Sequence, residues 1–533
     1  MKRPTLRSSG AGLALSAALA VTASAGDARA TGFTDIGDDL RSHVRSMFDL
    51  HGQFRLRGEM FHNLDLDRGP TPSGQLFFPV PLSDPQGQTL YAADMRLRTD
   101  LAVYAPGGGV AAKVRLDMPD NLALGGFPDG VPSASTSQRS PEFVARLKRA
   151  YGEVLTPIGL FAAGRMGNTW GLGMLANGGD CVDCDSGDSA DRIAFLTPLA
   201  GHVWAFAFDF SASGPFTKRG VQGRFVDVDP SDDVRSVTFA VLNFKNELAR
   251  ERRRKADKST FEYGAYVAYR WQDKDVPSTY LPATVNLPLT ASSVMERGYK
   301  AVAADGWARL TLPNGRIELE AALLYAYYEQ VSLLPGALLR QPSESLQFGV
   351  AVESDFGRPE DIFGGGLDLG VASGDPAPGF GVRQDNPLAQ QPLPGDLDGP
   401  QANVPLDSSI NNFRFHPDYR IDRILFREII GTVTDAFYIR PHVRLTALDL
   451  GTSQVTLSLT GIASFALEAS STPGGQSPLG VELDPTIAYK HNDGFGVSVD
   501  HGVLFPLAGL DNPALNLPAK PAQMLRVRAT YVF

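Results

Sequence analysis

The sequence has no long apolar run beyond its amino-terminal segment, so membrane-spanning helices are excluded. Nowhere after residue 30 are there about eighteen consecutive apolar residues, the length a helix needs to cross a bilayer. The mean hydropathy is −0.11 and the pI is about 5.4, an acidic balance that argues against a nucleic-acid partner. If this chain enters a membrane, it must do so with strands.

Catalytic and metal-binding signatures are also missing. The eight histidines are scattered, no HExxH spacing occurs, and no serine and histidine form a recognisable nucleophile motif. We therefore expect no enzyme and no catalytic cofactor. An outer-membrane lipid hydrolase remains a third hypothesis. It would need an outward-facing histidine, for which His501 is the candidate, although an interface histidine is the simpler interpretation.

Residues 1–30 have the features of a secretory signal peptide. Lys2, Arg3 and Arg7 precede the apolar stretch "AGLALSAALAV", and the small residues of 23–25 or of 28–30 offer a cleavage site. Removing this segment changes the formal charge from −10 to about −13. We expect residues 31–47 to be a periplasmic lead-in and residues 48–533 to form one unit, since no linker interrupts them.

Strict period-two alternation is the main structural signal. In "FDLHGQFRLRGEM" (48–60) every odd position is polar and the even positions are apolar or glycine. The pattern recurs in "ADMRLRTDLAVY" and "AKVRLDM". Strands of about ten residues are longer than those of most soluble sandwiches and suit a membrane-spanning barrel.

The connections between strands are short on one side and long on the other. Short links lie at 105–109, 156–159, 197–201, 313–315, 357–361, 450–453 and 491–494, and the basic run 246–258 is a longer link on the same side. Long polar loops lie at 62–91, 119–142, 167–190, 211–232, 272–297, 330–345, 372–435, 469–479 and 506–522. Nine long loops predict an all-β fold, a closed antiparallel transmembrane barrel of about eighteen strands. We interpret the basic run as a solvated periplasmic turn rather than a partner site.

The final segment "MLRVRATYVF" fits the last strand of such a barrel. Leu525, Val527 and Tyr531 would face lipid while Arg526 and Arg528 would face the lumen. The aromatic carboxy-terminus resembles the assembly signal of outer-membrane barrels. That resemblance implies outer-membrane lipid and the barrel assembly machinery as partners.

Several segments also resemble known barrel families. "GLFAAGRMGNTWGLGM" resembles a strand and loop entry of large porins. "GLDLGVASGD" and "LGVELDPTIAYKHNDGFGVSVDHGVLFPL" resemble strands of the alginate-export group, and "FRFHPDYRIDRILFREIIGTVTDAFYIRP" is similar to a related family of barrels of this length. The resemblance implies an eighteen-stranded outer-membrane barrel that passes an acidic polysaccharide such as alginate or another small solute.

The positions expected to face the lumen are rich in arginine. The cations are Arg55, Arg57, Arg96, Arg98, Lys113, Arg115, Arg165, Arg440, Arg444, Arg526 and Arg528. The opposing acids are Asp49, Glu59, Asp94, Asp100, Asp117 and Asp500. A wall of this kind attracts anions, whereas the alternative is that these groups pair across strands and only brace the wall. Both can hold at once.

Two long loops carry further features. In "NGGDCVDCDSGDSADR" the only two cysteines, Cys181 and Cys184, predict a disulfide outside the cytoplasm. The carboxylates Asp183, Asp185, Asp188 and Asp191 could wrap a structural calcium ion, although a solvated acidic loop is the simpler interpretation.

The loop 372–435 is long enough to fold into the lumen as a constriction or plug, or to cap the barrel surface instead. In the strand after this loop, Pro441 should mark a local break or bulge.

These observations predict an outer-membrane channel of a Gram-negative bacterium, a porin or exporter for anionic small solutes or an acidic polysaccharide. The alternative is a plugged barrel that serves as a surface receptor or structural anchor.

Overall fold

The computed structural model describes residues 47–82, 88–125, 144–214, 219–221, 223–227, 229–276, 294–331, 342–358, 360–380, 393–397 and 408–533. The predicted signal peptide and residues 31–46 of the predicted lead-in lie outside the described residues.

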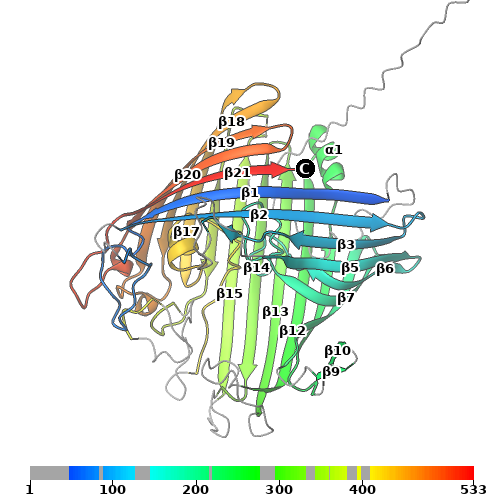
Figure 1. Ribbon diagram of the computed structural model, residues 1–533, viewed down its shortest axis with the longest axis horizontal. Helices are drawn as coiled ribbons and strands as arrows, with labels where there is room; N and C mark the ends of the chain where they lie inside the picture. Colours follow the sequence, from blue (N-terminus) through cyan, green and yellow to red (C-terminus); the bar gives the residue numbers. More distant parts are fainter. Residues whose placement is uncertain are drawn as a thin grey trace, which may run out of the picture.

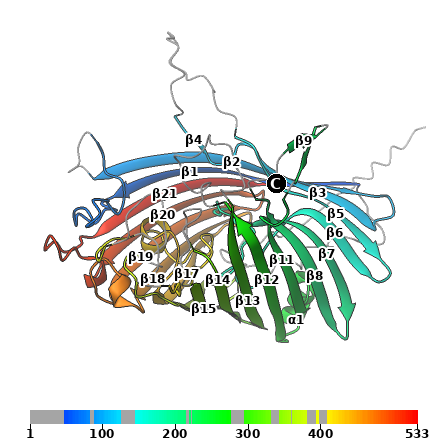
Figure 2. The ribbon, with the colours of Figure 1, turned by 90° about the horizontal axis from the view of Figure 1, so that it is seen from below.

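Eighteen antiparallel strands form a closed barrel (Figures 1 and 2). Each barrel strand pairs with the next along the chain, and β1 pairs with β21 to close the sheet. The strands are β1 (Phe48–His62), β2 (Thr89–Tyr104), β3 (Val110–Asp117), β5 (Arg146–Thr156), β6 (Gly159–Gly167), β7 (Ser189–Leu199), β8 (His202–Ala212), β11 (Val234–Asn243), β12 (Thr260–Asp275), β13 (Met295–Leu312), β14 (Gly315–Tyr328), β15 (Ser343–Phe356), β16 (Phe363–Ala372), β17 (Ala436–Asp449), β18 (Ser453–Phe465), β19 (Pro478–His491), β20 (Phe495–Pro506) and β21 (Ala522–Val532). The predicted architecture is confirmed.

The remaining elements are small and lie in the connections. Strand β4 (Leu122–Ala123) pairs with β2, and β9 (Arg219–Val221) pairs with β10 (Arg224–Val226). Helix α1 (Glu247–Lys255) occupies the basic short-side link, and a π-helix (Leu425–Ile429) and the 3-10 turns Ala469–Ser471 and Ala508–Leu510 lie in long-side loops. Among the residues that the structure describes, no helix is long and apolar enough to cross a membrane.

Alternating side chains give the barrel an apolar exterior and a polar lining. On β19 the outward side chains Val481, Leu483 and Ile487 are exposed, whereas the inward Glu482 and Asp484 are buried. The same alternation runs along β1 and β21, so Arg526 is buried inside while Val527 and Tyr531 are exposed outside. An apolar outer surface on a closed barrel needs lipid around it, and the protein is an outer-membrane protein.

The strand ends match the expected connections, with all nine long loops on one side of the barrel. At the short-turn side, Asn246 caps α1 by accepting a hydrogen bond from the Ala249 amide at 2.9 Å. Pro441 pairs with Leu367 of β16, while the pairing with β18 skips Arg440 and Pro441 and resumes in the same register. The predicted irregularity is therefore a local break without a bulge.

Several long-side loops contribute side chains to the barrel interior, and two of them form the candidate site. Residues 411–435, here called the plug segment, pack against inward-facing residues of β14 to β21 in one apolar cluster. Residues 168–188, the connection from β6 to β7, contact both the plug segment and the inner wall of β1, β2 and β21. The meeting point of these two loops with the wall is the candidate site.

Candidate functional site

The plug segment is held inside the barrel mainly by apolar burial. Ile424, Leu425 and Ile429 are at most 1% exposed. Small wall residues make room for it, because a side chain at Gly502 of β20 would collide with Arg423 and one at Gly349 of β15 with Phe413. Within the plug segment, residues 425–429 form a short π-helix.

Backbone amides add a polar anchor to the plug segment. The carboxylate of Glu482 accepts hydrogen bonds from the amides of Arg423 and Ile424 at 2.8 Å and of Leu425 at 3.1 Å. One wall glutamate therefore fixes the start of the π-helix. The sequence left open whether loop 372–435 plugs the lumen or caps the barrel surface, and the packing of residues 411–435 corresponds to a plug.

The first half of loop 168–188 is anchored in the same manner on the opposite wall. Glu320 of β14 accepts from the amides of Leu172 at 2.5 Å and Leu175 at 3.1 Å, and Trp170 donates to Asp305 at 2.8 Å. Trp170 also packs against Tyr266, with ring centroids 5.3 Å apart. This half of the loop is thus a fixed base that supports the second half.

The second half of the loop projects an acidic tip, residues 180–185, into a set of arginines. Cys181 and Cys184 form a disulfide across this tip. Seven guanidinium groups lie within 4 Å of the carboxylates of Asp183 and Asp185, and we call them the arginine cage. Its members are Arg55 and Arg57 of β1, Arg96 of β2, Arg526 and Arg528 of β21, and Arg420 and Arg427 of the plug segment.

Asp183 is the centre of the cage. Arg427 lies 2.7 Å from it, Arg528 3.3 Å and Arg526 3.6 Å. Burial by itself would raise the pKa of Asp183, but the surrounding guanidiniums outweigh it and hold that pKa well below its usual range. The same holds for Asp185, whose pKa is lowered chiefly by Arg57 and Arg55 against the effect of burial. Both carboxylates are therefore ionised at neutral pH.

Tip backbone atoms add to the contact. Val182 accepts from Arg55 at 3.2 Å and from Arg96 at 2.9 Å through its carbonyl oxygen. From the plug side, the carboxylate of Asp418 accepts from the amides of Asp185 and Ser186 at 2.9 Å. The acidic tip is thus enclosed between the wall of β1, β2 and β21 and the plug segment.

The tip offsets most of the positive charge of the cage. Apart from Asp183 and Asp185, the carboxylates within ion-pair distance of the seven arginines, among described residues, are Glu59, Asp94, Asp418, Glu428 and Asp500. Asp500 is shared with Arg423 of the plug segment, which lies 3.0 Å from it, so five fixed carboxylates face eight guanidiniums. The two tip aspartates neutralise two of the three positive charges that are left, and without the tip all three would be uncompensated in a partly desolvated lumen.

The other predicted lumen cations are braced by neighbours. Lys113 lies 3.3 Å from Glu153, Arg98 lies 2.8 Å from Asp117, Arg115 pairs with Asp100 at 2.6 Å and with Asp180, and Arg440 pairs with Asp368. Arg444 donates to the carbonyl oxygen of Arg358 at 2.8 Å. In this part of the wall the charged groups pair with one another, which is the alternative that the sequence left open.

Arg165 does not line the lumen, which corrects the prediction. It shares the outward face of β6 with Phe161, whereas Leu160, Ala162 and Met166 point inward and are buried. Arg165 pairs at 2.7 Å with Asp191, near the loop end of the barrel, so its charge is compensated there. Because both faces of this strand carry apolar residues, alternation alone could not assign its orientation.

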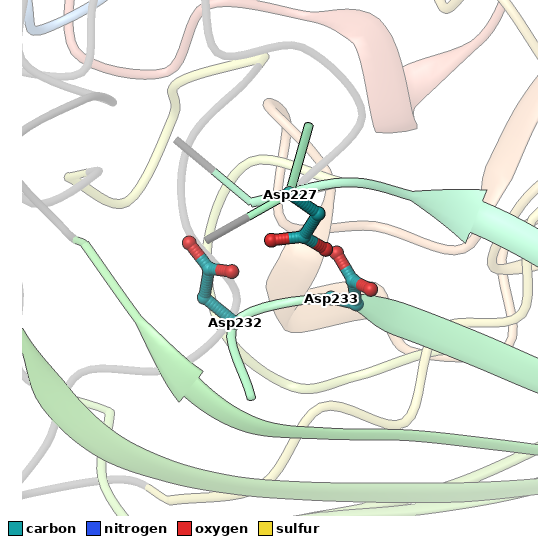
Figure 3. A group of neighbouring side chains, drawn as sticks. All are labelled: Asp227, Asp232 and Asp233. Atoms are coloured by element: carbon teal, nitrogen blue, oxygen red, sulfur yellow. The ribbon is translucent and has the colours of Figure 1, made fainter. Parts of the chain in front are cut away.

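The four carboxylates proposed for calcium do not form one site. Asp183 and Asp185 lie in the cage, Asp188 lies 3.4 Å from His416, and Asp191 pairs with Arg165. The group that does come together in the described part of the chain is Asp227, Asp232 and Asp233 in the loop before β11 (Figure 3). Arg235 lies 3.0 Å from Asp233 and offsets part of that charge.

The sequence did not assign the two cage arginines of the plug segment, Arg420 and Arg427, to a site. It also did not identify Arg149 of β5, which lies outside the cage and pairs with Asp180 at 2.7 Å. The acidic loop itself was interpreted as solvated. The available signal was charge complementarity, because "DCVDCDSGDSAD" is acidic and the strand pattern placed several arginines inward.

His501 lies on the outward face of β20, as expected. Its hydrogen-bond partner is Gln523, at 3.4 Å, rather than a serine. This contact does not pair a serine nucleophile with a histidine base, the arrangement that the lipid-hydrolase hypothesis requires.

No family model matches the chain, and no curated protein matches it. Among solved structures it is similar to OccK11 (OpdR) of Pseudomonas aeruginosa, with 10% identity over 91% of this chain and 96% of that one and a TM-score of 0.43. It is also similar to opdK of Pseudomonas aeruginosa, with 10% identity over 91% and 98% and a TM-score of 0.42, and to the channel DcaP of Acinetobacter baumannii, with 11% identity over 92% and 100% and a TM-score of 0.37. At these values the likeness carries no argument about function.

Proposed function

We propose that this protein is an outer-membrane channel for small anionic solutes. The observation that supports the proposal is the arginine cage, in which seven guanidiniums from the wall and the plug segment surround one point of the lumen. A clustered positive wall in a narrow, partly dehydrated passage raises the local concentration of anions although the chain as a whole is acidic.

The interior favours small solutes over a polymer as the cargo. The plug segment and loop 168–188 both extend into the barrel, and Asp418 and Arg420 join them across the interior. An extended polysaccharide would have to displace both loops along its whole length. The passage of alginate, which the sequence resemblance implies, remains a prediction. Alginate oligomers can be added in the bilayer test below to compare them with small anions.

Planar-bilayer recording in a potassium chloride gradient tests the proposal. We expect an anion-selective reversal potential, and the double substitution R57Q/R528Q should lower the chloride-to-potassium permeability ratio by up to about tenfold, because it removes two of the charges that concentrate anions. R165Q removes an arginine from the outward face and should leave the ratio unchanged. A cation-selective or non-selective wild-type channel would contradict the proposal.

A second candidate function is a plugged barrel that acts as a surface receptor or anchor. The burial of Ile424, Leu425 and Ile429 against the wall favours it, because such packing resists displacement by a solute. Electrical silence of wild type and of every cage variant would support this second candidate.

A further inference from the structure

The acidic tip lies where an anionic solute would bind, and its ion pairs are those a solute would make. Asp183 and Asp185 present two carboxylates to the cage, two residues apart on one disulfide-closed turn. The tip adds the carbonyl oxygens of Val182, Asp183 and Cys184, which accept from cage arginines. Every cage arginine is in ion-pair distance of at least one of them. A free molecule with two carboxylates could make the same ion pairs.

The tip also leaves donors of the cage unused. Arg55 Nε, Arg96 Nε and Arg420 Nε are buried and have no hydrogen-bond partner in the described part of the chain, and Arg526 Nη1 has only the 3.6 Å ion pair with Asp183. A buried donor without a partner costs free energy. The tip therefore does not satisfy every donor of the cage, which leaves hydrogen bonds for another anion to form.

The tip is joined to the anchored part of its loop through a neck of glycines. Gly178, Gly179 and Gly187 lie so close that a side chain on Gly187 would meet the Gly178 carbonyl oxygen at 2.5 Å, and Gly179 has a φ of +70°. Glu320 and Trp170 hold the base of the loop, which ends before this neck. The tip itself is held mainly by polar contacts: Cys184 is buried, but Cys181 is exposed and Val182 partly exposed.

We propose that the arginine cage is a binding site for a small organic anion with two carboxylates, and that Asp183 and Asp185 are a built-in, displaceable occupant of that site. This inference rests on the proposed function. The tip offsets two positive charges of the cage when no solute is present, and an incoming dicarboxylate takes its place on the same arginines. A dicarboxylate carries the same two negative charges as Asp183 and Asp185, so the exchange leaves the net charge of the site unchanged.

The test compares D183N/D185N with D191N, which removes an acidic charge from the same region but outside the cage. Two quantities are measured in planar bilayers: the chloride-to-potassium permeability ratio, and the concentration of succinate that halves the chloride current, with acetate as the one-carboxylate control. In D183N/D185N the ratio should rise, and the half-blocking succinate concentration should fall by roughly tenfold, because the internal competitor is gone. D191N should behave as wild type.

A second variant keeps the test independent of the charge change. C181S/C184S retains both carboxylates but opens the turn, and it should lower the half-blocking succinate concentration in the same direction by a smaller factor. Heat-modifiable migration on gels verifies that each barrel has folded. If wild type is anion-selective while succinate block is the same in wild type, D183N/D185N and C181S/C184S, the inference is overturned and the proposed function stands. If no variant prefers anions, the proposed function itself fails.

Discussion

The plug segment and the acidic tip both lie inside the barrel, but different forces keep them there. Ile424 and Ile429 of the plug segment are completely buried against the wall, whereas Asp183 and Asp185 of the tip contact mainly arginine side chains. Apolar burial persists regardless of which solutes are present. Ion pairs exchange with any competing anion, so the comparison indicates one permanent occupant of the lumen and one that can be replaced.

The substitution Ile424→Asp should have the largest effect, because it removes the apolar burial that distinguishes the plug segment from the acidic tip. It removes a fully buried side chain and places a carboxylate beside Glu482, at a cost of roughly 5 kcal/mol to the docking of the plug segment. We expect the segment to leave the wall, with higher single-channel conductance and new protease sites within 411–435.

Leu450→Asp is the matched control, because Leu450 is exposed in a short turn. Unchanged conductance together with an unchanged protease pattern in Ile424→Asp would contradict a plug held by apolar packing.

A pair of glutamate substitutions sharpens the comparison at the anchors. Glu482→Ala removes the acceptor of three plug amides, and Glu320→Ala removes the acceptor of the amides at Leu172, Met174 and Leu175. Each change should weaken its own loop by roughly 2–4 kcal/mol, because buried donors left without acceptors cost about 1–3 kcal/mol each.

Hydrogen exchange measures the outcome amide by amide. We expect faster exchange at 423–425 in Glu482→Ala and at 172–175 in Glu320→Ala, with the Asp185 and Ser186 amides still protected by Asp418 in the second variant. Asp493→Ala, in an exposed short turn, is the control. Loss of protection at Asp185 in Glu320→Ala would show that base and tip move as one body.

The difference between the two loops also explains what the sequence could predict. Alternation and turn residues are local signals, so the strands, the short links and the inward arginines of β1, β2 and β21 follow directly from them. The cage does not, because Asp183 and Arg526 meet only after the barrel has closed. Local patterns also fail on β6, where the inner face packs against Trp170 and is as apolar as the outer face, which left Arg165 misassigned.

A change of pH should affect the stability of the plug segment and of the acidic tip differently, and this is the smallest of the expected effects. Burial raises the pKa of Asp435, at the end of the plug segment, to about 7, and burial together with Glu482 raises the pKa of Asp422 well above its usual value. A raised carboxyl pKa means that the folded state binds its proton more tightly, so docking of the plug segment gains stability as pH falls through about 7 and loses it as pH rises. The pKa values of Asp183 and Asp185 are lowered, so their effect on stability has the opposite pH dependence, and the tip contacts weaken only as pH falls below the usual carboxyl range.

Between pH 8 and pH 5, hydrogen exchange corrected for its intrinsic rate should therefore slow by at least about tenfold in the plug segment and stay constant at the Asp185 and Ser186 amides. Tip amides that lose protection already at pH 5 would mean that the cage does not hold these carboxylates ionised, and a displaceable dianion would then have no electrostatic basis.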